Sequence, residues 1–184
     1  MIREFIGKTP LLEGKNFVAD SADVIGDVRL GPQSSVWFNV TIRGDVNRIR
    51  IGSRSNVQDN SCIHVTHETA PTVIGDEVTI GHSAIIHGCR IRDRVLIGMG
   101  AIVLDHADIG SDSIVGAGAL VTSRTVVPPR SMVLGSPARV VRELTDVEIA
   151  SIRSYAANYV RYSAVYLGLE QPATNPFYDA SAPE

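Results

Sequence analysis

Aliphatic residues recur at every sixth position along most of the chain, and this is its dominant pattern of hydrophobic positions. Small or β-branched residues, such as Ser34, Ala101 and Ala119, recur four positions after the aliphatic ones. A period of six excludes an amphipathic helix, in which apolar residues return every three or four positions. It predicts short strands separated by tight turns, with the aliphatic residue facing inward and the small residue at a corner. Three such hexads close a triangular coil of about 18 residues, and stacked coils form a solenoid. The repeated aliphatic positions are Val18, Val24, Leu30, Val36, Ile42, Ile51, Val57, Ile63, Ile74, Ile80, Ile86, Ile91, Ile97, Val103, Ile109, Val115, Val121, Val127 and Val133.

The repeat loses its phase at three places, all of them in the middle of the chain. The step is nine residues from Ile42, eleven from Ile63 and five from Ile86 to the next aliphatic position. The eleven-residue step contains residues 67–71, which we expect to form a loop inserted at a corner of the coil. Because insertions in solenoids gather on the binding face, the pattern directs the search for function to residues 42–91.

The pattern also predicts how the chain is organised along its length. A β-helix domain is expected over residues 1–140, because the repeat stops at a Gly-Ser-Pro-Ala-Arg segment, 135–139. An amphipathic helix is expected over 141–170, beginning with a capping box of Thr145 and Glu148 and ending near Leu167 before Gly168. Its tyrosines recur at helical spacing and should pack against the β-helix; they are Tyr155, Tyr159, Tyr162 and Tyr166. The Pro- and Ala-rich residues 171–184 are expected to be a flexible tail.

Composition narrows the range of functions. The net charge is −3 and basic residues do not cluster, so no nucleic-acid partner is expected. No apolar stretch is long enough for a membrane span, and residues 1–12 lack the apolar run of a secretory signal. The chain is therefore expected to be cytoplasmic. Its two cysteines, Cys62 and Cys89, are expected to be buried free thiols.

Three histidines in the irregular zone are candidate metal ligands. His64 directly follows the anchor Ile63, and His87 directly follows the anchor Ile86. If the eleven-residue step is one hexad plus a five-residue loop, these anchors are one full coil apart, and the two histidines stack on one face. Imidazoles on neighbouring coils can share one metal ion at about 2.1 Å each. His82 lies two positions after its own anchor, near a different corner, so a neighbouring subunit would have to supply the third ligand.

The same counting gives each histidine a polar neighbour one coil below it. Arg43 shares the face of His64, and Asp59 shares the position of His82. A subunit interface that joins the histidines would therefore also bring Arg43 to Asp59, where an ion pair would fix the register of the subunits. The alternative for each single histidine is a turn or core residue without a ligand role. His106 has no partner in phase, and we interpret it as structural.

Four segments of the chain form a specific combination: Arg43-Gly44-Asp45, Asn56-Val57-Gln58-Asp59-Asn60, His64, and the two histidines between Gly81 and Gly88. Together with their spacing, these segments resemble the signature of the γ-class carbonic anhydrase-like family of hexapeptide-repeat proteins. The resemblance extends over about residues 10–170. It implies a left-handed parallel β-helix with a C-terminal helix packed alongside, assembled as a homotrimer with metal sites between subunits. The activity it implies is reversible hydration of CO₂ to bicarbonate by a metal-bound hydroxide.

The resemblance also implies roles for individual residues. His64 and His87 would bind the metal from one chain, and His82 would bind it from the neighbour. Gln58, oriented by Asn56, would hydrogen-bond the metal-bound water. Arg43 and Asp59 would form an intersubunit ion pair, and Asp45 would take part in the polar network beside that pair. Tyr159 would be the helix residue that points into the site.

The sequence departs from the family pattern near the expected proton shuttle. Val46 stands where a glutamate is expected, and the inserted loop is short. His67 occupies a shuttle-like position and is either a proton relay or a solvated loop residue. Three imidazoles suit Zn²⁺, and Co²⁺ or Fe²⁺ would also fit. Two other functions stay open: a hexapeptide-repeat acyl-CoA transferase or thioesterase, whose histidine would act as a base, and a non-catalytic trimeric metal-binding scaffold.

Overall fold

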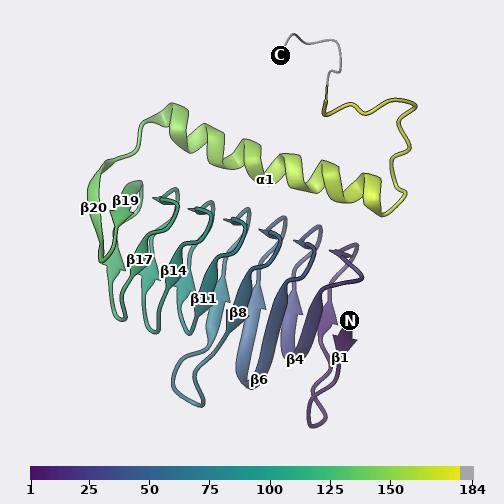
Figure 1. Ribbon diagram of the computed structural model, residues 1–184, viewed down its shortest axis with the longest axis horizontal. Helices are drawn as coiled ribbons and strands as arrows, with labels where there is room; N and C mark the ends of the chain where they lie inside the picture. The colour runs from purple at the N-terminus through teal and green to yellow at the C-terminus, as the bar shows by residue number, and fades with distance from the viewer. Residues whose placement is uncertain (179–184) are drawn as a thin grey trace.

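The computed structural model describes residues 1–178 as a triangular prism of stacked coils with one helix alongside (Figure 1). The first of its three faces lies under the helix, and we call it the helix-covered face. Its strands pair in parallel except for the antiparallel last pair. They are β3 (Phe17–Val18), β5 (Ser35–Val36), β7 (Asn56–Val57), β10 (Thr79–Ile80), β13 (Leu96–Ile97), β16 (Ile114–Val115), β19 (Ser131–Gly135) and β20 (Ala138–Glu143).

The other two faces belong to one sheet that bends around a corner, because β4 (Asp23–Leu30) and β6 (Thr41–Ile51) run across both. The face that carries His64 is called the histidine face. It contains β1 (Ile2–Arg3), the first halves of β4 and β6, β8 (Cys62–His64), β11 (Ile85–His87), β14 (Ile102–Val103) and β17 (Leu120–Val121). The remaining face, called the charged face, contains β2 (Leu11–Leu12), the second halves of β4 and β6, β9 (Thr72–Ile74), β12 (Arg90–Ile91), β15 (Asp108–Ile109) and β18 (Val126–Val127).

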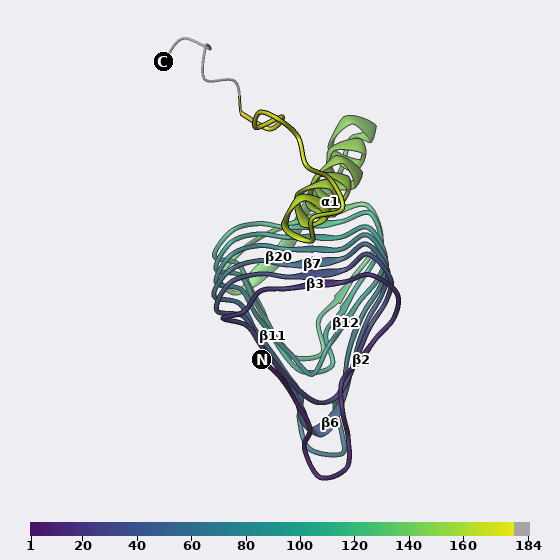
Figure 2. The ribbon, with the colours of Figure 1, turned by 90° about the vertical axis from the view of Figure 1, so that its right-hand side faces the viewer.

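The coil is left-handed, as expected. Viewed from the N-terminal end, the chain passes from β10 on the helix-covered face to β11 and then to β12, anticlockwise as it recedes (Figure 2). The six-residue period is also confirmed as the spacing of the core. On the histidine face, Ile42, Ile63, Ile86, Val103 and Val121 follow one another in register, and each is fully buried. Their inward stacking gives the solenoid one continuous apolar core.

All three phase breaks fall at the corner between the histidine face and the charged face, which we call the loop corner. The first is the bend within β6, the second is the 65–71 loop between β8 and β9, and the third is the shortened turn at Gly88 and Cys89. The loops of this corner protrude at the foot of the prism (Figure 2). The predicted insertion is therefore confirmed, and it lies beside the ends of β8 and β11, where His64 and His87 are located.

The corners require a left-handed backbone conformation at one residue per turn. From Gly88 to Arg130 these residues recur every six positions, and His106 is one of them, with φ of 61°. Small residues such as Ala101 and Ala119 are buried beside the turns. A histidine in a repeated turn position needs no ligand role to explain it. The structural interpretation of His106 therefore agrees with its geometry.

The C-terminal helix α1 (Asp146–Tyr166) packs along the helix-covered face. Thr145 and Glu148 form the predicted capping box, and Gly168 has the left-handed conformation, with φ of 68°, that often follows a helix end. Only some of the helix tyrosines pack against the β-helix as predicted. Tyr159 and Tyr162 contact the core, whereas Tyr155 is 49% exposed. The buried residues of the helix are not tyrosines; they are Ile149, Ile152, Ala156 and Ser163.

Ion pairing lowers the pKa of Glu148 to about 2, chiefly through its hydrogen bonds with Arg142 and also through those with Thr145. A carboxyl whose folded pKa is depressed stabilises the fold above its unfolded pKa, and this contribution is lost as pH falls through the folded value. We therefore expect Glu148→Gln to lower the melting temperature at neutral pH, with the difference from wild type shrinking between about pH 4.5 and pH 2. Thermal unfolding followed by circular dichroism across this range measures it. Glu68→Gln on the exposed loop is the control, and a pH-independent difference would contradict the prediction.

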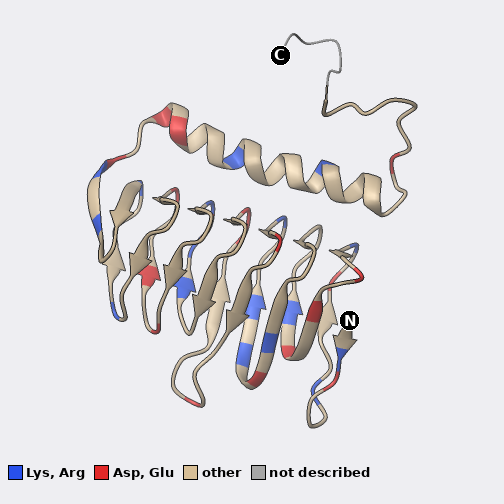
Figure 3. Ribbon diagram, viewed as in Figure 1, with Lys and Arg blue, Asp and Glu red and all other residues tan. Residues whose placement is uncertain are grey.

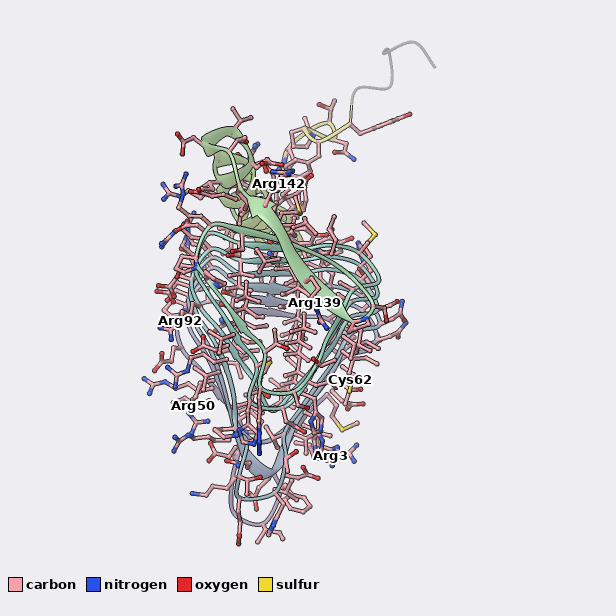
Figure 4. The ribbon with its side chains drawn as sticks, turned by 90° about the vertical axis from the view of Figure 1, so that its left-hand side faces the viewer. Arg3, Arg50, Cys62, Arg92, Arg139 and Arg142 are labelled. Carbon is pink, nitrogen blue, oxygen red and sulfur yellow. The ribbon has the colours of Figure 1, made fainter. Side chains whose placement is uncertain are left out.

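One expectation about the cysteines is wrong. Cys89 is buried, but Cys62 is exposed on the histidine face. It precedes the inward-facing Ile63, so the alternation of a strand turns its side chain outward. Figure 4 shows Cys62 on one side of the prism and Arg50 and Arg92 on the opposite side. Among residues 1–178 we find no helix whose length and apolar content would let it span a bilayer.

Helix α1 spans Asp146–Tyr166, which lies inside the predicted range of 141–170, and residues 167–170 separate it from the predicted tail. Within residues 171–178, the ring of Phe177 packs edge to face on Tyr162 at 4.7 Å between centroids. Residues 179–184 of the predicted tail lie outside the described residues.

Candidate metal centre

His64 and His87 are brought together by parallel pairing of β8 with β11, as the repeat predicts. The two residues are direct register partners, and Nδ1 of His64 lies 3.2 Å from Nε2 of His87. Two metal–nitrogen bonds of about 2.1 Å spanning this separation would enclose an angle of about 100°, which is close to tetrahedral. The pair therefore offers two nitrogen ligands at the spacing that one tetrahedral ion requires.

The outer nitrogen of each ring in this pair is held by a carboxylate. Nε2 of His64 lies 3.0 Å from Oδ1 of Asp45, and Nδ1 of His87 lies 2.7 Å from Oδ1 of Asp105. With the protons on these outer nitrogens, the lone pairs of Nδ1 in His64 and Nε2 in His87 face each other. Carboxylates that orient imidazoles in this way are typical of protein metal sites, because they fix the tautomer and make the ligand more basic.

His82 lies at another corner, between the helix-covered and histidine faces, just after β10. Its Nδ1 is 2.8 Å from Oδ2 of Asp59, so its Nε2 is left available. The predicted stacking of Asp59 one coil below His82 is confirmed by the backbone bond from Ser83 to the carbonyl of Asp59. His64 and His87 thus each have one nitrogen bonded to a carboxylate, and one nitrogen of His82 lies in close contact with a carboxylate.

Within one chain the three histidines do not form a complete site. Among residues 1–178, no group of three His, Cys, Asp or Glu side chains is arranged to hold a metal ion. The donor set nevertheless fits a tetrahedral ion, because it supplies a converging imidazole pair and a third imidazole at a different corner with a carboxylate-held outer nitrogen.

Arg43 lies in β6 on the same face as His64, because Ile42 and Ile63 are register partners. In the single chain its guanidinium contacts the carboxylate of Asp45. Burial raises the pKa of Asp45, but hydrogen bonds from His64 and Arg43 outweigh burial and hold this pKa below its ordinary value. An ionised Asp45 therefore connects Arg43 to the histidine pair. No contact between Arg43 and Asp59 occurs within the chain as described.

A short chain of buried amides leads toward the His82 corner. Nε2 of Gln58 donates to Oδ1 of Asn56 at 3.1 Å, and Nδ2 of Asn56 donates to Oγ1 of Thr79 at 2.9 Å. The predicted orientation of Gln58 by Asn56 thus has a direct geometric basis. The carbonyl of the Gln58 side chain is left free to accept a hydrogen bond.

The two remaining candidates differ in their surroundings. His67 is on the 65–71 loop with its side chain 68% exposed, and its Nε2 lies 3.9 Å from Glu68. Tyr159 is half-buried against Trp37, with 5.2 Å between ring centroids. Burial, together with the negative charge of Asp59, raises the pKa of Tyr159 to about 12, so it stays a neutral phenol. Tyr159 therefore belongs to the His82 corner, whereas His67 belongs to the loop corner.

Asp105 is the residue of this site that sequence reasoning missed. It holds His87 and also accepts a hydrogen bond from Oγ1 of Thr66 at 3.1 Å. The repeat does not single it out, because Ile86 and Val103 are register partners 17 residues apart, which places Leu104 and not Asp105 one coil above His87. Asp105 reaches His87 from the neighbouring turn position.

Comparison with known proteins gives three further findings. A family model described as bacterial transferase hexapeptide (six repeats) matches residues 88–123. The chain is 43% identical over 175 residues to a carbonic anhydrase of Geobacillus kaustophilus, covering 95% of this chain and 96% of that relative. It is 48% identical over 157 residues to gamma carbonic anhydrase 1, mitochondrial, of Arabidopsis thaliana, covering 83% of this chain and 57% of the relative. The chain thus spans a little over half the length of the plant protein.

Among solved structures, a hexapeptide transferase family protein from Anaplasma phagocytophilum superposes with a TM-score of 0.87 at 37% identity. The superposition covers 90% of this chain and 98% of that structure. The similarity therefore extends over the β-helix and the helix together. The names of the similar proteins divide between carbonic anhydrase and transferase.

Proposed function

Because this chain belongs to the γ-class carbonic anhydrase-like family of hexapeptide-repeat proteins, we propose that it is a metalloenzyme that hydrates CO₂ reversibly to bicarbonate. The observation that carries the proposal is the geometry of the histidines. His64 and His87 point two nitrogens at one position and have their other nitrogens bonded to Asp45 and Asp105. Nδ1 of His82 lies 2.8 Å from Asp59. A divalent ion bound there, Zn²⁺ or else Co²⁺ or Fe²⁺, would supply a water acidified to near-neutral pKa.

The other residues of the site would orient the reactants and move the proton. Gln58, held by Asn56, has a free carbonyl oxygen that can accept a hydrogen bond from the reacting water. Tyr159 would close the site from the helix side as a neutral phenol. His67, whose imidazole is exposed on its loop, would exchange the released proton with solvent.

We propose further that the protein works as a homotrimer in which His82 of one chain completes the site of its neighbour. Two observations support this assembly. His82 and the histidine pair lie at opposite edges of the histidine face. The strands between them carry no Lys, Arg, Asp or Glu (Figure 3), and outward-facing Cys62, Ile85, Ile102 and Leu120 are direct register partners. An uncharged apolar row of this kind suits a subunit interface.

By the same reasoning, the charged face is expected to stay exposed to solvent in the proposed trimer. It carries ion pairs such as Arg92 with Asp108, at 2.9 and 2.7 Å, and Arg50 with Asp27, at 2.7 Å. Exposure of Cys62 would then be a property of the separate chain, because the proposed interface covers its strand.

Anaerobic purification, followed by metal analysis and a stopped-flow CO₂ hydration assay on the same sample, tests the proposed function. We expect about one ion per chain, and turnover that depends on loading with zinc, cobalt or ferrous iron. Protein without bound metal would contradict the metal site. Protein that binds metal but leaves CO₂ hydration at background would favour the trimeric scaffold.

The transferase names among the similar proteins support a second candidate, an acyl-CoA transferase or thioesterase. That chemistry requires a histidine acting as a base. In this chain the inner nitrogens of His64 and His87 lie 3.2 Å apart with their outer nitrogens bonded to aspartates, and this convergence of two lone pairs favours metal binding over a single histidine base. CoA-dependent acyl turnover in the same sample would overturn this preference.

The proposed trimer predicts an effect of Arg43→Ala. If Arg43 pairs with Asp59 across the interface, its removal should weaken assembly and shift the protein toward monomer at low concentration. Sedimentation velocity over a dilution series measures the shift, with Arg92→Ala on the charged face as the matched control. An unchanged dissociation profile for Arg43→Ala would contradict the proposed ion pair.

A further inference from the structure

A cavity of about 950 Å³ opens between the C-terminal end of α1, residues 168–177 and the His82 corner. All of its lining residues belong to one chain. The segment that forms one wall leaves the C-terminal end of α1 and turns back above the helix (Figure 1). This volume is at the upper end of the range typical of small-molecule sites and exceeds what CO₂ needs. The cavity can therefore admit an organic ligand larger than CO₂.

The wall of the cavity is unusually rich in aromatic rings. The chain contains ten aromatic residues, and six of them line this one cavity. They pack mainly edge to face, with 4.7 to 6.2 Å between ring centroids for neighbouring pairs. The six residues are Trp37, Phe38, Tyr159, Tyr162, Tyr166 and Phe177.

The charge in the wall is entirely negative. Asp59 and Glu170 line the cavity, and none of its described lining residues is Lys, Arg or His. Asp59 also contributes to the raised pKa of Tyr159, which is the behaviour of a phenol in a negative, partly desolvated setting. Outside the lining, the guanidinium carbon of Arg161 lies 5.2 Å from the ring centroid of Phe177. One ring of the wall thus already attracts a cation.

From this combination we infer that the cavity binds a small organic cation, with a quaternary or methylated ammonium group held by the aromatic rings and the carboxylate of Glu170. Asp59 adds to the negative potential of the wall but has its own contact with His82. Aromatic faces attract such cations through their quadrupole, and the interaction strengthens where water is excluded. The same wall repels polyanions, so coenzyme A is a poor match. Asp59 and Tyr159 line this cavity and also belong to the proposed CO₂ site, so the two sites are neighbours. The cation site is therefore tested at Phe177 and Glu170, which have no role in the proposed CO₂ chemistry.

The only tryptophan of the protein, Trp37, lines the cavity and reports on binding through its fluorescence. We expect choline to change this fluorescence saturably. Its neutral carbon isostere, 3,3-dimethyl-1-butanol, should bind at least about ten-fold more weakly, because it has the same shape without the charge. Equal binding of the two compounds, or no response to choline at millimolar concentration, would overturn the inference.

Variants test whether binding occurs in this cavity. Phe177→Leu and Glu170→Gln should each weaken choline binding several-fold, whereas the exposed matched controls Phe5→Leu and Glu68→Gln should not. Circular dichroism confirms that each variant is folded. Unaltered affinity in both cavity variants would overturn the assignment to this site.

One variant separates the proposal of the metal site from the proposal of the cation site. His87→Ala removes a candidate metal ligand and leaves the cavity lining intact, so this variant should bind choline as wild type does. Loss of choline binding in His87→Ala would overturn the claim that one chain forms the cavity independently of the metal.

Discussion

Replacing His82 by alanine should reduce bound metal from about one ion per chain to background, although His64 and His87 stay paired in every chain. The reason is geometric. In the proposed trimer, Nδ1 of His64 and Nε2 of His87, 3.2 Å apart in one chain, would supply two ligands, and His82 of another subunit would supply the third. Metal analysis after dialysis measures the loss, and CO₂ hydration should disappear with it. His106→Asn is the matched control, because asparagine tolerates the left-handed turn conformation at that position.

Mixed trimers make the same prediction sharper. A chain with His82→Ala keeps its histidine pair, and a chain with His64→Ala keeps its His82. Random assembly from equal amounts should therefore restore about one quarter of the interfaces, where an intact pair meets an intact His82. Neither variant alone should bind metal. A mixture that recovers no metal at all would show that the three ligands do not come from different chains.

The fold was predictable because a parallel solenoid converts sequence period directly into position. Once Ile63 and Ile86 are recognised as anchors one coil apart, the stacking of His64 on His87 follows without further information. The same arithmetic placed Asp59 beneath His82. Few folds translate spacing along the chain into spacing across the structure so simply.

Other features depend on interactions that the period does not encode. The exposure of Cys62 required attention to the direction of each strand residue, since it precedes an inward anchor. The aromatic cavity depends on how residues 168–177 return across the end of α1. The predicted tail was interpreted from composition alone, which gives no information about where Phe177 would pack. Packing of irregular segments is set by tertiary contacts, and sequence spacing does not determine these.

At the metal centre, the contact of Asp105 with His87 is likewise not encoded by the sequence period. Replacing Asp105 is expected to have the second large effect. Replacing Asp105 by alanine should weaken metal binding by about 10- to 100-fold, because the carboxylate fixes the tautomer of His87 and raises the basicity of its Nε2. Asp105→Asn should have a smaller effect. Its amide oxygen can still accept the proton of Nδ1, but the negative charge that strengthens the ligand is gone.

Competition with a chelator of known affinity measures the loss for each variant without reference to enzyme activity. Asp108→Asn is the matched control, since this nearby aspartate pairs with Arg92 on the charged face. The graded order, with wild type strongest, Asp105→Asn intermediate and Asp105→Ala weakest, distinguishes control of the ligand from general destabilisation. A purely structural role for Asp105 would lower the melting temperature of the metal-free protein and leave the chelator titration unchanged. That result would remove Asp105 from the site and leave His87 oriented by its backbone pairing alone.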